Sequence, residues 1–235
     1  MFIGMGMPIP DLSNLPGPSR PGGGGSAFEY TAIDNSFSME FDGVSSYYYG
    51  PPLGDLIDLD PATSTFTISC WIYAPSIGYR GICASANFSN GLQLYTNGSN
   101  LYFGIAGGSS QINAGITYAA GWHHVAASFN GPEFGGTTLR LYFDGTQIAT
   151  GTGNRSGTLF ANYNLDIGAR NDAAGAAGTF WLGNLDEFAM FSTVLSEETI
   201  KAIYDATANN PGKVADLSET PEGEPTAWYR MGDQL

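Results

Sequence analysis

Short runs of β-forming residues, separated by Asn-Gly, Asp-Gly and Gly-Gly pairs, fill the sequence from Phe37 onward. These pairs favour tight turns between antiparallel strands. In residues 66–72 every second side chain is apolar, which gives a predicted strand one buried face: Phe66, Ile68, Cys70 and Ile72. Antiparallel strands of this kind pack as two sheets face to face. The sequence therefore predicts an all-β sandwich, whose clearest strands are residues 37–43, 64–74, 80–86, 91–96, 100–106, 121–129, 137–145 and 146–151.

One segment, residues 196–208, has the pattern of an α-helix. Ser196 is a suitable N-cap, and two glutamates follow it in the first turn, where negative charge is favourable. The predicted inner stripe of this helix is Ile200, Ile203 and Tyr204. We expect an acidic linker over residues 209–225, followed by a last strand in residues 226–235 that returns to the sandwich.

The first 26 residues differ from the rest of the chain because they are rich in Pro and Gly, a composition typical of an extended segment. They also carry apolar side chains that suit docking on a partner: Phe2, Ile3, Met5, Met7, Ile9, Leu12 and Leu15. We therefore expect an N-terminal arm over residues 1–26 and one sandwich domain over residues 27–208.

The 235-residue chain is acidic, with 8 Lys and Arg residues against 22 Asp and Glu residues and a formal net charge of −14. So few cations cannot neutralise a run of phosphates, which argues against nucleic acid and anionic membranes as partners. No apolar run reaches the roughly 18 residues of a spanning helix, so we expect no membrane insertion. The opening MFIGMGMPIP has no basic residue and two early prolines, so we expect no secretory signal peptide.

The two cysteines, Cys70 and Cys83, are too few for a disulfide scaffold in a chain of this size. Free cysteine is among the most buried residue types, so we interpret both as small core residues. A bridge between neighbouring strands is the alternative.

Several motifs follow one another along the chain: SMEFDG, FTISCWIY, GWHHVAASFNG, LRLYFDGTQI, LDIGARN and FWLGNLDEFAMFSTVLSEETIKAIY. In this order they resemble the laminin-G-like and pentraxin-like modules of the concanavalin A-like lectin/glucanase superfamily. The resemblance covers residues 37–207 and implies a jelly-roll sandwich of two curved antiparallel sheets. Because the superfamily includes glycosidases, lectins and structural modules, the fold alone does not choose the function.

The Gly- and Pro-rich leader, fused directly to such a sandwich, is similar to structural proteins of tailed bacteriophages. This resemblance implies a non-enzymatic virion protein, either a capsid decoration (cement) protein or a tail-associated one, anchored by its arm. Its partners would be the major capsid protein or other virion proteins. It would be made in the host cytoplasm and displayed on the outer surface of the virion, in many copies or as a homo-oligomer. The alternative is a carbohydrate-binding, lectin-like adhesion module that recognises a host surface glycan.

The carboxylates do not follow the pattern of the superfamily's glycosidases, which is Glu-x-Asp-x-x-Glu with the two reacting groups roughly 5 Å apart. Here Asp186 and Glu187 are adjacent, and adjacent residues of a strand point to opposite faces. By the same reasoning His123 and His124 face opposite sides, and we expect one of them to be half-buried and hydrogen-bonded. We therefore expect no enzymatic activity and no required cofactor.

The family resemblance also implies a calcium site in some members, built where the first and last strands come together. Asp42, the Gly43 carbonyl and Asp186 are the residues that would contribute oxygen ligands to a structural calcium ion here. The alternative is that Asp42 forms a turn with nearby backbone N–H groups and that Asp186 accepts backbone hydrogen bonds.

Aromatic rings on the surface are the candidates for a glycan or protein contact. They are Tyr47, Tyr48, Tyr49, Tyr79 and Tyr95, with Trp181 also available. Alternation along a strand exposes at least one of three consecutive tyrosines. Because aromatic residues are enriched at protein interfaces, we favour a protein contact over a glycan contact.

Overall fold

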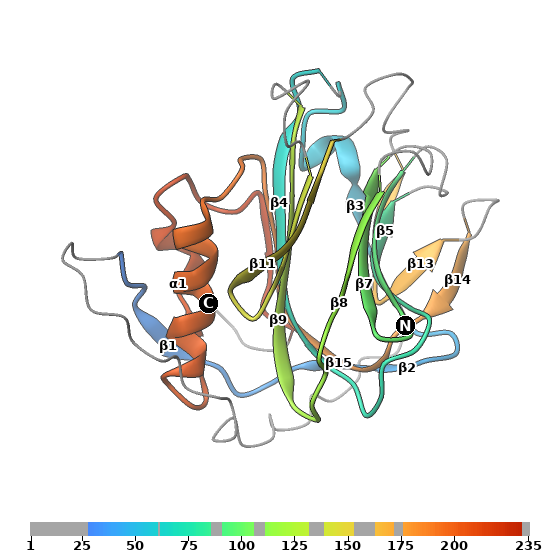
Figure 1. The fold of residues 1–235 in the computed structure, drawn as a ribbon, viewed down its shortest axis with the longest axis horizontal. Helices are drawn as coiled ribbons and strands as arrows, with labels where there is room; N and C mark the ends of the chain where they lie inside the picture. Colours follow the sequence, from blue (N-terminus) through green and yellow to red (C-terminus); the bar gives the residue numbers. More distant parts are fainter. Residues whose placement is uncertain are drawn as a thin grey trace.

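The computed structural model describes residues 28–60, 62–85, 91–105, 111–131, 139–152, 163–171 and 176–231. These residues form two antiparallel sheets packed face to face, with one α-helix on the outer side of one sheet (Figure 1). The prediction of an all-β jelly-roll sandwich with one helix is confirmed. The arm predicted for residues 1–26 lies outside the described residues.

The first sheet has six strands in the order β3-β12-β5-β6-β7-β8, and each neighbouring pair is antiparallel. Asn97 and Gly98 begin the turn between β6 and β7, as the Asn-Gly pair predicts. The strands are β3 (Tyr48–Pro52), β5 (Arg80–Ser85), β6 (Leu92–Asn97), β7 (Asn100–Ile105), β8 (Gln111–Gly115) and β12 (Asn164–Ile167).

The second sheet follows the order β11-β10-β9-β4-β15-β17, and β2 also pairs with β15. Strands β2 and β17 pair with different parts of β15, so the long β15 joins the beginning of the described chain to its end. The strands are β2 (Met39–Asp42), β4 (Thr65–Tyr73), β9 (Trp122–Asn130), β10 (Leu139–Phe143), β11 (Thr146–Gly151), β15 (Leu182–Phe191) and β17 (Ala227–Tyr229).

The main core lies between the two sheets. Its members on β4 are the four residues that the alternation predicts, all fully buried: Phe66, Ile68, Cys70 and Ile72. Strands β6 and β7 of the facing sheet contribute Leu94 and Phe103, and the Phe103 ring lies 6.2 Å from that of Phe66, centroid to centroid. Side chains that alternate with these on β6 and β7 point to the outer face of the six-stranded sheet.

A second layer covers the outer face of the other sheet. Helix α1 (Glu197–Ala208) begins as predicted, with the Ser196 Oγ accepting a hydrogen bond from the Thr199 N–H at 3.1 Å. Its buried stripe contains Ile200, Ile203 and Tyr204, and the Tyr204 ring stacks on Trp71 of β4 at 5.9 Å. No helix among the described residues is long and apolar enough to cross a membrane.

Residues 209–225, which we predicted as an acidic linker, contain regular structure. Strand β16 (Lys213–Ala215) pairs with β1 (Ala32–Asp34), and a single 3-10 turn, η4 (Leu217–Glu219), follows. The physical reason is that Val214 and Leu217 bury their side chains in the layer beneath α1. The last predicted strand is present as β17, which pairs with β15.

Cys70 lies on β4 and Cys83 on β5, so the two thiols belong to opposite sheets. Both are free and buried, in agreement with their interpretation as core residues rather than as a bridge. Burial raises the pKa of both thiols, which keeps them in the unreactive protonated form.

His123 and His124 point to opposite sides of β9, as predicted. The His123 Nδ1 lies 2.8 Å from the Asp144 carboxylate and its Nε2 lies 3.0 Å from the Ala119 carbonyl oxygen. The His124 Nε2 lies 2.8 Å from the Ser69 Oγ, on the side that faces α1. We expected one histidine to be half-buried, but both are buried. The reason is that the helical layer covers the second face of the sheet.

The burial of His124 makes the stability of the fold depend on pH. Burial lowers its pKa to about 4, against the opposing effect of Asp144, whereas the unfolded value is near 6.5. As the pH falls from 6.5 towards 4, the unfolded chain takes up a proton that the folded protein does not, so stability is lost. We expect this histidine to contribute a loss of about 2 to 3 kcal/mol between pH 7 and pH 4.5.

Urea unfolding at these two pH values, with wild type and His124→Gln, measures this contribution. The pKa of His123 is raised, because burial, which lowers it, is outweighed by the contacts with Asp144 and Ala119. This residue therefore adds stability as the pH falls from 7, and it does so equally in wild type and in the variant. The variant should lose less stability than wild type on acidification. Equal losses in the two proteins would contradict the assignment.

Candidate functional site

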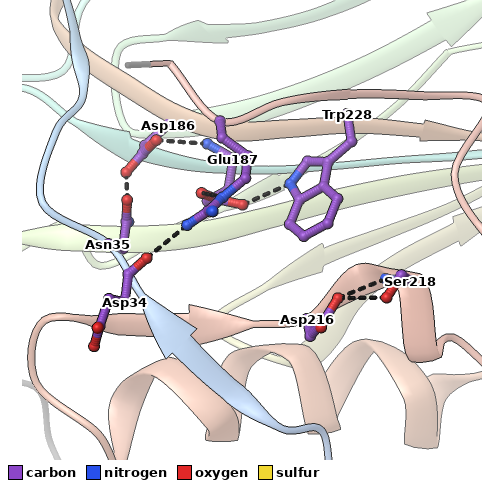
Figure 2. Close-up of polar contacts among 8 residues, drawn as sticks. Asp34, Asn35, Asp186, Glu187, Asp216, Ser218 and Trp228 are labelled. Atoms are coloured by element: carbon purple, nitrogen blue, oxygen red, sulfur yellow. Dashed lines mark hydrogen bonds and ion pairs between the residues drawn. The ribbon is translucent and has the colours of Figure 1, made fainter. Parts of the chain in front are cut away.

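Asp186 and Glu187 lie on the same side of β15, and our prediction that they face opposite sides is wrong. Asp186 is opposite Trp71 of β4, whereas Ala189 is opposite Ser69, so β15 contains one extra residue, a β-bulge. Glu187 adopts a left-handed backbone conformation there, with φ of 48°. The bulge turns its carboxylate into the layer between the sheet and α1, where Figure 2 shows it beside Asp186.

Both carboxylates are buried and occupied by donors from the protein. Asp186 accepts hydrogen bonds from the Asn35 side-chain amide at 2.7 Å and from the Glu187 N–H at 2.8 Å. Glu187 accepts from the Trp228 indole N–H at 2.6 Å and from the Arg230 Nε at 3.2 Å (Figure 2). Arg230 also donates to the Asp34 carbonyl oxygen at 2.6 Å. This network therefore ties the segments around β1 and β17 to β15.

The residues predicted for calcium are not brought together. Asp42 is opposite Leu182, four residues before Asp186 on β15, which places the two residues about 13 Å apart along the strand. The Asp42 carboxylate accepts from the N–H groups of Ser45, Ser46 and Val44, which hold its pKa well below the usual range. Asp42, Gly43 and Asp186 do not fit one calcium ion. The described part of the chain contains no group of three or more His, Cys, Asp or Glu residues that suits a metal.

The predicted aromatic candidates divide into exposed and buried residues. Tyr47, Tyr49 and Tyr79 are exposed, whereas Tyr48 is half-buried against Tyr229. Trp181, which we counted as available for a contact, is fully buried. Its indole N–H donates to the backbone carbonyl oxygens of Tyr73 on β4 and Asn184 on β15. It is a core residue, so it is removed from the list of contact candidates.

Three tyrosines and one arginine gather on the outer face of the six-stranded sheet. Tyr95 and Tyr102 are opposite each other on β6 and β7, with their rings stacked at 4.9 Å and 10°. Tyr79 meets Tyr95 edge to face at 5.8 Å. The Arg170 guanidinium lies 4.7 Å from the Tyr95 ring centroid and 5.2 Å from that of Tyr79. We call these four residues the tyrosine platform.

A glycine allows Arg170 to reach this position. Arg170 lies on β13 (Ala169–Asn171), which forms a ribbon with β14 (Ala177–Phe180) beside the six-stranded sheet (Figure 1). At Gly81 of β5 the backbone of this ribbon comes so close that an added Cβ would lie 1.9 Å from the backbone nitrogen of Arg170. Only a residue without a side chain permits this backbone contact. Gly81 therefore lets β13 lie close to β5, and this brings the Arg170 guanidinium over the rings.

A row of polar and small side chains crosses the same face beside the platform. The strand register aligns Tyr49, Asp166, Ala84, Gln93, Gly104 and Gln111 across six strands. We call Asp166, Gln93 and Gln111 of this row the polar row. Gln111 donates from its side-chain Nε2 to the Tyr95 hydroxyl at 2.7 Å, which joins the polar row to the tyrosine platform. Burial raises the pKa of both the Tyr95 hydroxyl and the Asp166 carboxyl.

The sequence model of the concanavalin A-like lectin/glucanases superfamily matches residues 42–201. The chain belongs to this superfamily. No curated protein matches it by sequence.

Several solved structures share the fold of this chain at low sequence identity. A putative carbohydrate-binding protein from Bacteroides ovatus matches with a TM-score of 0.58 and 16% identity, over 84% of this chain and 53% of that one. The sialidase module CBM40 of Ruminococcus gnavus, bound to α2,3-sialyllactose, matches with a TM-score of 0.52 and 14% identity, over 71% and 95%. A heptameric SAP-like pentraxin from Limulus polyphemus has a TM-score of 0.52 and 17% identity, over 70% and 80%. At these identities the likeness shows the fold alone.

Within this superfamily fold, sequence reasoning identified only part of the site. Tyr79 and Tyr95 were candidates, but Tyr95 is buried in the tyrosine platform rather than exposed. Tyr102 was missed, although it alternates with Leu101 and Phe103 in NLYFGIA and so had to point outward. Arg170 had no sequence signal, because its place depends on a contact between distant segments.

Proposed function

We propose that this protein is a lectin-like module that binds carbohydrate on the outer face of the six-stranded sheet. The tyrosine platform is the observation that carries the proposal. Aromatic rings offer an apolar surface with polar edges, which suits the C–H face of a sugar ring and its hydroxyl groups. Tyr95 and Tyr102 stand on strands β6 and β7 rather than on loops, so these two rings are held rigidly.

The comparisons support this proposal through fold likeness. Two of the similar structures are described as carbohydrate-binding, one of them with a bound sialyllactose. Among the readings of the sequence, these matches favour the lectin-like alternative over the virion structural role. They do not choose the sugar, because related folds bind different ligands.

The virion role remains a prediction from the arm. It rests on residues 1–26, which lie outside the described residues. Attachment by the arm and glycan binding by the sheet are compatible, because they use different parts of the chain. Display of the module on a particle, contacts with capsid or tail proteins and multiple copies belong to this second proposal.

Binding to a glycan array, followed by titration calorimetry of the strongest hit, tests the proposal. We expect saturable binding that Tyr102→Ala weakens at least tenfold, equivalent to about 1.4 kcal/mol. Phe28→Ala is the control, since Phe28 is an exposed aromatic residue that lies near α1, in the other layer of the molecule, whereas Tyr102 is half-buried in the platform. Absence of saturable binding, or equal affinities of wild type and Tyr102→Ala, would contradict the proposal.

A further inference from the structure

A groove of about 660 Å³ lies between β1, η4 and the segment that leads into β17. Its apolar surface comes from Ile33, Pro225 and Trp228, and all three residues are half-buried. Figure 2 shows the Trp228 ring above Asp216 and Ser218, which line the same groove. None of the four residues of the tyrosine platform lines it, so this groove is a separate candidate binding surface.

The Trp228 ring is held in place by its own chain. Its indole N–H donates to the buried Glu187 carboxylate at 2.6 Å, and the Arg230 guanidinium lies 5.6 Å from its ring centroid. Arg230 is fixed in turn by Glu187 at 3.2 Å and by the Asp34 carbonyl oxygen at 2.6 Å. A ring held in this way loses little conformational entropy when a partner packs against it.

The rim of the groove is acidic, with the carboxylates of Asp34, Asp216 and Glu224. Asp34 forms an ion pair with Lys213 at 2.8 Å. Within the described part of the chain, Asp216 and Glu224 have no ion pair with a basic side chain. Two carboxylates without a matching cation favour a positively charged partner in this groove.

The N-terminal arm contains a segment of matching chemistry. Residues 16–21, which lie outside the described residues, have the sequence PGPSRP. Pro18 and Pro21 are three residues apart, which is one turn of a polyproline II helix, so their rings share a face in that conformation. Arg20 is the only Lys or Arg in residues 1–27. Proline-rich segments dock on grooves lined by aromatic rings, and an arginine pairs well with carboxylates beside such a groove.

The arm is long enough to reach the groove of its own chain. Ile33 already lines the groove, and Phe28 precedes it by five residues, so Phe28 is at most about 17 Å away. The seven steps from Pro21 to Phe28 span up to about 24 Å, and four of the six residues between them are glycine, which lets the chain turn back. Tethering also gives the segment a high effective concentration, so weak contacts suffice.

We propose that residues 16–21 of the arm dock in this groove of the same chain. The two prolines pack against Trp228, and the arginine lies beside the two carboxylates that lack an ion pair. This inference goes beyond glycan binding and does not depend on it, because the groove and the tyrosine platform share no residue. Docking fixes the base of the arm on the sandwich and leaves residues 1–15 for contact with a partner.

A spin label at residue 13 of the full chain tests the inference. Ser13→Cys provides one reactive thiol for the label, because Cys70 and Cys83 are buried and protonated. In the ¹⁵N-labelled protein we expect the label to broaden the amide signals of Asp34 and Ala227 in the groove. The signals of β6 and β7, in the other sheet, should keep their intensity.

Two variants of the labelled chain test the proposed contacts. Pro18→Ala combined with Pro21→Ala removes the rings, and Glu224→Lys reverses the charge of an exposed residue on the rim. Each should lower the paramagnetic broadening in the groove by roughly twofold or more, since even one exposed ion pair contributes up to about 1 kcal/mol. None of the three substitutions touches the core, so the sandwich should stay folded.

Matched controls accompany the two variants. Pro8→Ala combined with Pro10→Ala changes two prolines of the arm outside the segment. Glu40→Lys makes the same change of charge at an exposed residue of β2 that does not line the groove. Both controls should show the broadening of the labelled chain without further substitutions.

Four outcomes would overturn the inference. They are no broadening in the groove, broadening centred on α1, equal broadening with and without the test substitutions, and broadening in a mixture of spin-labelled ¹⁴N protein with unlabelled ¹⁵N protein. The last outcome would show that the arm of a second copy occupies the groove. No glycan is present in these measurements, so a negative result leaves the proposed function unaffected.

Discussion

Replacing Glu187 by glutamine should lower the free energy of unfolding by about 3 to 5 kcal/mol. The reason is the burial of the ion pair that this carboxylate forms with Arg230, in which both side chains are less than 10% exposed. Glutamine keeps the shape of the side chain but removes the charge, so the buried guanidinium loses the carboxylate beside it. The Trp228 indole also loses a charged acceptor. Urea unfolding at pH 7 measures the loss.

Two further variants separate the ion pair from a general effect of charge. Lys213→Met removes the cation of the exposed Lys213–Asp34 pair and should leave stability unchanged. Glu187→Gln combined with Arg230→Met removes both buried charges and should recover most of the stability lost in the single variant. A single variant as stable as wild type would show that the network does not anchor β17.

The second large effect is expected at Gly81. A Cβ there would lie 1.9 Å from the backbone nitrogen of Arg170 and 2.1 Å from the carbonyl carbon of Ala169. Gly81→Ala must therefore push β13 away from the sheet. We expect a loss of about 3 kcal/mol in the free energy of unfolding. Because Arg170 moves with β13, glycan affinity should also fall. Urea unfolding and calorimetry of the same preparation measure both effects.

Gly115→Ala is the matched control for this substitution. Gly115 lies on β8 of the same sheet, and its nearest neighbour to an added Cβ is 3.8 Å away. This variant should fold and bind as wild type does. If Gly81→Ala also does so, the close contact between β5 and β13 does not hold the platform together.

Much of the fold could be predicted from the sequence, because period-two alternation and turn pairs are local signals. Residues 64–74 show this best, since their alternation marks the face that packs in the core, even though the layer under α1 buries the other face as well. The helix was equally accessible through its cap and its apolar stripe. The same rule failed at Glu187, because a bulge adds one residue to β15 and nothing in NLDEFAMF marks it. The prediction of a linker over residues 209–225 was wrong. The segment is acidic overall, and this composition gave no sign that two of its side chains, Val214 and Leu217, are buried beneath α1.

The site was harder to predict because it is made by register between strands and by contacts between distant segments. Asp166, Gln93 and Gln111 are ordinary polar residues in the sequence, and they form a row only when β12, β6 and β8 are aligned. Arg170 reaches the tyrosines only because β13 lies against Gly81. Burial of Tyr95 follows from the same arrangement, so counting tyrosines in the sequence could not reveal which ones form a platform.

The most direct measurement of glycan binding at this face is amide chemical-shift mapping of the ¹⁵N-labelled protein with the strongest array ligand. We expect the largest shifts on β6 and β7, around Gln93, Tyr95 and Tyr102, and none on α1. The shifts should saturate with the affinity found by calorimetry. Shifts confined to α1 or to β11, with β6 and β7 unchanged, would contradict binding on the outer face of the six-stranded sheet.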